Sequence, residues 1–94
     1  MVHKINYEGV FRAIEGLKDK IEETMPSVKG SIDIVISNNI TSSLIIERLL
    51  DQLLNYASLG IGEEEFRRLN QYYATINKEN ASFYEKELDT FNSE

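Results

Sequence analysis

Residues 66–87, FRRLNQYYATINKENASFYEKE, contain the pattern that decides the fold. Alternating spacings of three and four residues connect seven positions in this stretch: Phe66, Leu69, Tyr73, Ile76, Asn80, Phe83 and Glu87. Residues with this spacing share one face of an α-helix, and a long apolar face is typical of a helix that packs along another helix. The stretch therefore predicts a long amphipathic helix, which we extend from residue 41 to residue 89.

A second stripe with the same spacing precedes the first. It consists of Val10, Ile14, Leu17, Ile21, Thr24, Val28, Ser31 and Val35, and Asn6 is placed to cap the start of its helix. Ser37, Asn38 and Asn39 separate the two stripes, and these residue types favour turns. We expect an all-α fold in which two helices form an antiparallel hairpin, with residues 1–94 as one domain.

Two interruptions are expected to bend these helices. Pro26 lacks a backbone N–H, so helix one should be kinked near it, although the apolar stripe keeps its phase across the proline. Gly60 and Gly62 interrupt helix two, and the register of Phe66 is out of phase with that of Leu50. We therefore predict a bend in helix two near Gly60–Gly62.

Composition limits the classes of partner. The 94 residues carry a net charge of -6, which disfavours binding to nucleic acid or to an anionic membrane surface. There is no cysteine, so disulfides and thiolate chemistry are excluded. The first residues show no apolar run of the kind found in secretory signal peptides. A cytoplasmic location is expected, with co-export to the extracellular space by a non-Sec route as the alternative.

The sequence offers little to support catalysis. His3 has no Ser, Cys or Asp arranged with it as in a catalytic triad, and it is best explained as a solvated terminal residue. Glu63, Glu64 and Glu65 point in different directions on a helix, and they favour a helix N-terminus more than a cation site. The glycines form no phosphate-binding loop. We expect no catalytic residue, metal or cofactor, and hence a protein that is not an enzyme.

Aromatic and aliphatic residues exceed what one helical seam can cover. Tyr73 and Phe83 are explained most simply as seam residues, because they share its spacing. A second apolar face is predicted from residues that fall outside the seam, and we assign partner binding to Leu44, Ile45, Leu49, Tyr72 and Tyr84. The chain is therefore expected to bind another helical protein.

The end of the second stripe also carries a short motif. Phe83-Tyr84-Glu85-Lys86-Glu87 places an aromatic ring and a carboxylate four residues apart on one helix face. In a helical hairpin of this length, the motif resembles the export signal of WXG-like small proteins of Gram-positive type VII secretion, with Glu87 where Asp is usual. The turn has no Trp-x-Gly and reads Ser37-Asn38-Asn39, which is more similar to the Lap proteins, the small partners of LXG toxins.

This resemblance implies a targeting factor or chaperone. Its client would be the N-terminal helical LXG domain of a toxin. A second small helical partner could bind the same domain. Phe83 and Glu87 would then present the complex to the secretion ATPase and its membrane machinery. A different class of function is also open: two copies could form a homodimeric four-helix bundle, a structural or regulatory module that buries the same stripes without a client.

Overall fold

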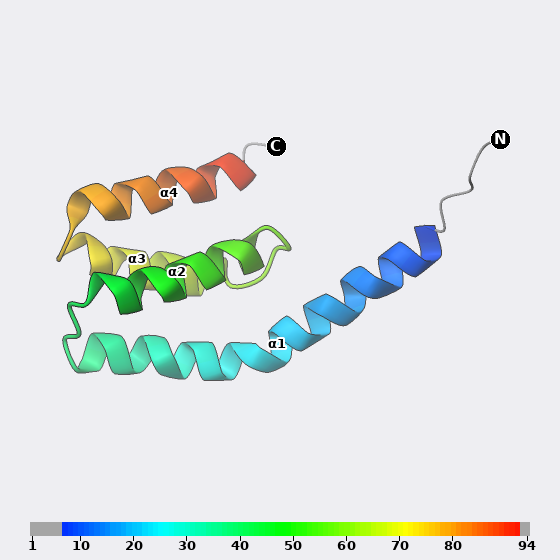
Figure 1. Cartoon of the computed structure of the whole chain (residues 1–94), viewed down its shortest axis with the longest axis horizontal. Coiled ribbons are helices and arrows are strands. Elements are labelled where there is room, and N and C mark those ends of the chain that lie inside the picture. The colour runs from blue at the N-terminus through cyan, green and yellow to red at the C-terminus, as the bar shows by residue number, and fades with distance from the viewer. Residues whose placement is uncertain (1–6, 93–94) are drawn as a thin grey trace.

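The computed structural model describes residues 7–92, and within this range the chain forms α-helices and no strand. The helices are α1 (Tyr7–Ser37), α2 (Ser43–Ala57), α3 (Glu63–Ala74) and α4 (Lys78–Asn92) (Figure 1). The all-α prediction is confirmed for this part of the chain. The predicted two-helix hairpin is corrected, because the region expected to be one bent helix forms three helices that fold back on one another. His3 and Asn6 lie outside the described residues.

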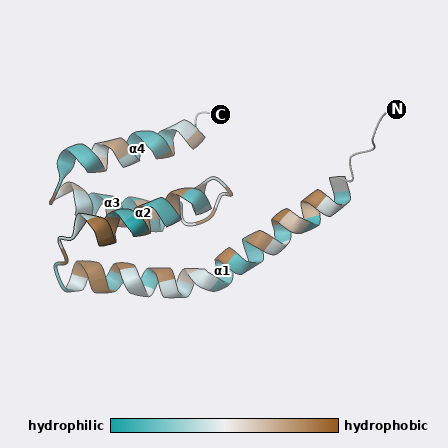
Figure 2. Cartoon of the chain, in the orientation of Figure 1, coloured by the Kyte–Doolittle hydropathy of each residue, from teal (hydrophilic) through white to brown (hydrophobic). Residues whose placement is uncertain are grey.

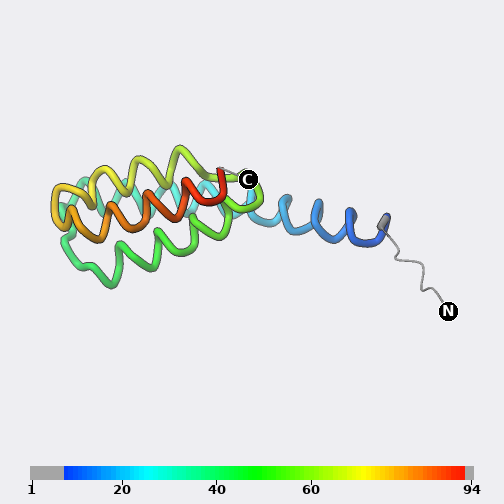
Figure 3. The backbone as a smooth tube through the Cα atoms, turned by 90° about the horizontal axis from the view of Figure 1, so that it is seen from above, coloured from blue at the N-terminus to red at the C-terminus, as the bar shows by residue number. Residues whose placement is uncertain are grey.

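The four helices differ in length, and this gives the molecule its shape. Helices α2 and α3 pack against each other and against both α1 and α4, whereas α1 and α4 do not contact one another. At 12 to 15 residues, helices α2 to α4 are about half as long as the 31-residue α1. They cover its C-terminal half only. The N-terminal half projects from the bundle (Figures 1 and 3), and the Cα trace measures 57 × 26 × 19 Å. We call this projecting segment, residues 8–20, the arm.

The buried face of α1 is rotated slightly from the predicted stripe. It consists of Ile21, Met25, Val28, Ile32 and Val35. The prediction had Thr24 and Ser31 in place of Met25 and Ile32. Steps of three and four residues both lead back to the same face of a helix, and the more apolar side chain occupies it. The Thr24 hydroxyl instead donates to the carbonyl oxygen of Lys20, at 2.8 Å, within its own helix.

Helix α1 changes direction where the arm leaves the bundle, in the cyan part of the ribbon in Figure 1. Pro26 lies inside this helix. Its ring removes one helical hydrogen bond and crowds the carbonyl group of residue 22, which bends a helix without ending it. The bend separates the exposed arm from the packed half of α1.

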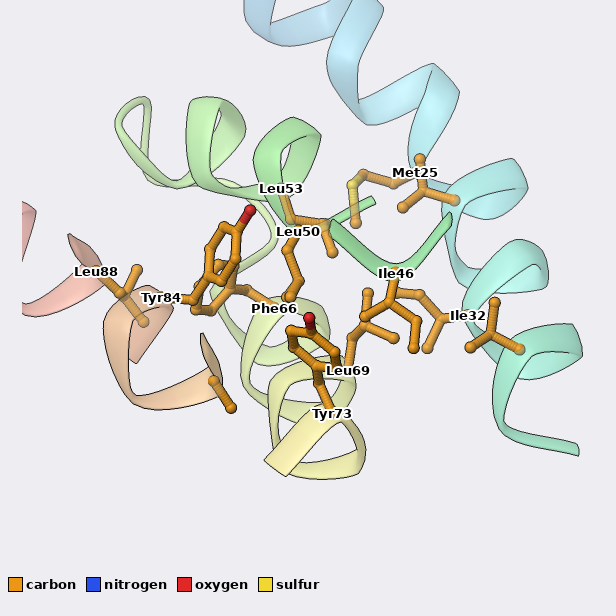
Figure 4. Close-up of a cluster of buried hydrophobic side chains, with 13 residues drawn as sticks. Met25, Ile32, Ile46, Leu50, Leu53, Phe66, Leu69, Tyr73, Tyr84 and Leu88 are labelled. Carbon is orange, nitrogen blue, oxygen red and sulfur yellow. The ribbon is translucent and has the colours of Figure 1, made fainter. Parts of the chain in front are cut away.

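One hydrophobic core runs through the bundle, and all four helices contribute to it (Figure 4). Phe66, Leu69 and Tyr73 of α3 are almost completely buried in it, and α3, like α2, packs against every other helix. Fully burying a side chain of this size stabilises the fold by roughly 1.5–3 kcal/mol. The other core residues are Met25, Val28, Ile32, Val35, Ile46, Leu50, Leu53, Ala81, Tyr84 and Leu88.

The chain reverses direction between consecutive helices by different means. After α1 it turns through Asn38 and Asn39, and Asn39 takes a positive φ of 52°. Between α2 and α3, the glycines at 60 and 62 have φ values of 79° and 83°, a region that side chains disfavour. The turn between α3 and α4 contains neither glycine nor proline. There the Asn77 side chain accepts a hydrogen bond from the backbone N–H of Asn80, at 3.0 Å, in the first turn of α4.

Candidate partner-binding surface

The motif residues Phe83 and Glu87 both lie on α4. Phe83 is 58% exposed although it is one of the largest apolar side chains in the protein, and its ring meets the edge of Tyr84 with centroids 5.6 Å apart. Glu87 is half-buried one turn further along. The interpretation of Phe83 as a seam residue is therefore wrong, and the ring is accessible to another molecule.

Tyr84 was predicted to bind a partner, and the structure contradicts this. Only 6% of it is exposed, and its ring packs 6.4 Å from that of Phe66. The cause is the turn before α4, which resets the helical phase: α4 buries Ala81, Tyr84 and Leu88 instead of the register that continues from Tyr73. A rotation of one residue, about 100°, exchanges the environments of Phe83 and Tyr84.

The other predicted partner-binding residues divide into two groups. Leu49 is half-buried against the core, and Tyr72 is half-buried with its hydroxyl donating to the carbonyl oxygen of Ile40, at 2.7 Å. These two therefore serve the fold by holding α2 and α3 in place. Leu44, at 64%, and Ile45 are exposed in the first turn of α2, where Figure 2 shows a strongly hydrophobic segment.

Beside Phe83, the structure contains a groove that sequence analysis missed. The α3–α4 groove has a volume of about 250 Å³, and small side chains such as Ala74, Ala81 and Ser82 allow close approach to its floor. Ser82 and Lys78 also line a shallow hollow next to Phe83. The two depressions therefore share Lys78 and Ser82 of α4 in their linings. The full lining of the groove is Phe66, Arg67, Asn70, Gln71, Ala74, Lys78, Ala81, Ser82, Glu85 and Leu88.

Asn70 gives the groove a specific polar feature. This residue is buried, and its Nδ2 donates to the carbonyl oxygen of Ala81, at 2.8 Å. Its Oδ1 is buried without a hydrogen-bond partner. Exchanging the two amide atoms would place two acceptors against each other, so the unpartnered atom is an acceptor. A buried acceptor of this kind costs about 1–3 kcal/mol until a donor reaches it. Asn70 is not part of the predicted stripe, so the sequence pattern did not indicate this site.

A second exposed surface lies on the arm. Val10, Phe11, Ile14 and Leu17 are all exposed, with Phe11 the most exposed at 61%. The sequence predicted that three of these residues would pack against helix two, but α2 and α3 do not extend that far along α1. At the foot of the arm is a groove of about 560 Å³, which we call the foot groove. It is lined by Leu17, Lys20, Ile21, Thr24, Asn55, Tyr56, Ser58 and Leu59.

Two buried tyrosines attach α3 and α4 to carboxylates of α2. The Tyr73 hydroxyl donates to Glu47 Oε2 at 2.5 Å, and the Tyr84 hydroxyl donates to Asp51 Oδ1 at 2.8 Å. Asn80 Nδ2 also donates to Glu47 Oε2, at 3.1 Å. Burial raises the pKa of Tyr84 well above its usual value, and the hydrogen bond to Asp51 acts in the same direction. These contacts fix the rotation of α4 and therefore the exposure of Phe83.

Substituting Tyr84→Phe should lower the free energy of unfolding by about 1 kcal/mol, because it removes the hydrogen bond to Asp51. The pKa of Tyr84 is raised by folding, so its stabilising contribution is complete below pH 10 and is lost as the pH rises above that value. The variant should therefore lose less stability than the wild type between pH 8, about 2 units below the unperturbed tyrosine pKa, and pH 11, about 1 unit above it. Urea denaturation at the two pH values measures this. Equal losses in the two proteins would contradict the assignment.

Residues 7–92 contain no cluster of three or more His, Cys, Asp or Glu side chains able to hold a metal ion. Within the same residues, no helix combines the length and the apolar character needed to cross a membrane. Comparison with known proteins found no matching family, curated protein or solved structure. The chemistry of the surface itself must therefore carry the functional argument.

Proposed function

We propose that this protein is a non-catalytic targeting factor that binds the N-terminal helical LXG domain of a toxin effector. In this proposal, Phe83 and Glu87 present the complex to a type VIIb secretion system, and the protein works in the cytoplasm or leaves the cell with its cargo. A second small helical partner and the secretion ATPase complete the set of expected partners. The choice of an LXG domain as client and of a type VIIb system as exporter rests on the resemblance of the Phe-x-x-x-Glu motif to the export signal of WXG-like proteins.

The observation that carries the proposal is the exposure of Phe83. An aromatic ring that is 58% exposed on a packed helix contributes little to the fold. When another protein covers such a ring, it becomes a strong anchor, because aromatic residues dominate binding energy at the centres of interfaces. Glu87 lies four residues later and adds a charge that sets the register of the partner.

The α3–α4 groove supports a helical partner for the same surface. Its small side chains allow a helix to approach closely, and the lining also includes the core residues Phe66 and Leu88.

Substituting Phe83→Ala should reduce the amount of toxin exported by at least tenfold while the toxin domain still co-purifies, as expected when a central aromatic anchor for the secretion machinery is lost. The measurements are affinity co-purification with an LXG domain encoded beside this protein, and quantification of that toxin in culture medium. Phe91→Ala is the matched control, since Phe91 is an exposed phenylalanine on the same helix, at 39%. Glu87→Gln and Glu85→Gln form a second matched pair that tests the charge.

Three outcomes would oppose the proposal. The first is the absence of any complex between the wild-type protein and the LXG domain. The second is equal loss of export in the Phe83 and Phe91 variants, which would indicate a nonspecific effect on α4. The third is unchanged export after Phe83→Ala, which would remove the motif from the mechanism even if the complex formed.

A further inference from the structure

The arm carries an apolar face with nothing packed against it. Val10, Ile14 and Leu17 lie on one side of the helix at spacings of four and three, Phe11 lies beside them, and all four are exposed. The arm is the N-terminal part of one continuous 31-residue helix, so its apolar face stays in water unless another surface covers it. The arm therefore needs a partner surface that the rest of the described chain does not supply.

We propose that the arm is a dimerisation element that pairs in antiparallel fashion with the arm of a second copy of this chain. A two-fold axis between Ile14 and Leu17 makes the surface complementary to itself. It brings Ile14 of one copy opposite Leu17 of the other, and Val10 opposite Ile21. A two-fold dimer requires this reciprocity: when one residue of the first copy contacts a second residue of the other copy, the same contact occurs with the copies exchanged.

The foot groove lies where this pairing needs it. It begins at Leu17 and continues through Ile21 to Thr24, with Tyr56 and Leu59 on its other side. The axis that pairs the two arms also brings the end of each arm, at Val10, to the foot groove of the other copy. The end of the arm and the foot groove lie at equal distances from the axis. The arm of each copy therefore occupies the foot groove of the other copy.

The charges on the arm permit this contact. Glu8, Glu15 and Asp19 lie on the side of the helix opposite the seam, and Glu8 forms an ion pair of 2.7 Å with Arg12 on that side. The positions that flank the seam hold Phe11, Ala13, Lys18 and Lys20. Antiparallel pairing places Lys18 beside Phe11 of the second copy, and Lys20 beside Ala13. Each lysine can therefore lay its aliphatic stem on an apolar neighbour, with no carboxylate facing another across the seam.

The available area is sufficient for a dimer. The four exposed side chains present roughly 350 Å² of apolar surface per copy, or about 700 Å² in a pair. Apolar atoms make up about 60% of an interface, so the whole contact would bury about 1,200 Å². This is the lower end of the range for stable protein–protein interfaces, which predicts a dimer of moderate affinity.

The test begins with light scattering on the full chain alone, from low to high micromolar concentration. We expect the mass to rise from 10.8 kDa to twice that value. Leu17→Ser should weaken dimerisation at least tenfold and leave the helical content unchanged, because Leu17 lies outside the core. Ile34→Ser is the matched control, since Ile34 is an equally exposed apolar residue at the far end of α1, and its dimer should persist.

The antiparallel orientation of the two arms is tested by oxidation of single-cysteine variants. The chain has no cysteine of its own, so any disulfide must join the introduced residues. A mixture of Ile14→Cys and Leu17→Cys proteins should form a mixed disulfide faster than either variant alone. A mass of 10.8 kDa at all concentrations would overturn the proposal, as would equal dissociation of the Leu17 and Ile34 variants. Because no toxin domain is present, the result is independent of the proposed function. The proposal would also fail if the chain alone stays monomeric and an LXG domain protects the arm from hydrogen exchange. The arm would then bind the toxin domain and not a second copy of this chain.

Discussion

Substituting Leu69→Ala should lower the free energy of unfolding by about 3–4 kcal/mol. Leu69 is fully buried in α3, the helix that packs against α1, α2 and α4 together. Truncation removes apolar contacts in the core and leaves a cavity that the surrounding helices can close only in part. A domain of this size has a total stability of only about 5–10 kcal/mol, so the variant should be close to unfolding at 37 °C.

Urea denaturation followed by circular dichroism measures the loss. Leu44→Ala is the matched control, because it makes the same chemical change at an exposed position of α2, and it should alter stability by less than about 0.5 kcal/mol. Similar losses in the two leucine variants would show that α3 does not occupy the centre of the bundle. A large loss at Leu69 alone would support its burial in the core of the bundle.

The second large effect is expected at Gly62, where Gly62→Ala should cost about 2–3 kcal/mol. Two causes add together. The φ of 83° is unfavourable for any residue with a Cβ, and an added Cβ would lie 3.3 Å from Leu53 Cδ2 and 3.5 Å from Met25 Cε. The distance to Met25 is an ordinary contact, but the Leu53 side chain, which belongs to the core, would have to shift slightly.

The glycines of the chain allow these two causes to be separated. Gly60→Ala has a similar positive φ but meets nothing within 4 Å, so it should cost only about 1 kcal/mol. Gly16→Ala lies in α1 with open space around it and should stabilise the arm slightly. Thermal denaturation of the three variants should rank Gly62 as the most damaging. Equal effects at Gly60 and Gly62 would show that the contact with Leu53 is unimportant.

Errors in the sequence-based prediction of the site come from α4. The register that begins at Phe66 and Tyr73 was continued through Ile76 to Asn80, because no glycine or proline marks the turn between α3 and α4. Asn77, which caps α4, was the one available signal. The turn rotates the following helix by about one residue, so Tyr84 is buried and Phe83 is exposed. The motif residues were thus predicted by their spacing, whereas their accessibility depended on a turn that spacing could not reveal.

The sequence by itself determined that the chain is helical, because both stripes repeat with the period of an α-helix. It also placed breaks at Asn38–Asn39 and at the two glycines, where the backbone needs conformations that few residues adopt. Only the tertiary structure decided which side of each stripe is buried, as with Met25 over Thr24, and which part of α1 is left uncovered. An apolar stripe specifies that a helix needs a partner, but the length and crossing of its neighbours select the residues that are covered. The arm and Phe83 are exposed for that reason.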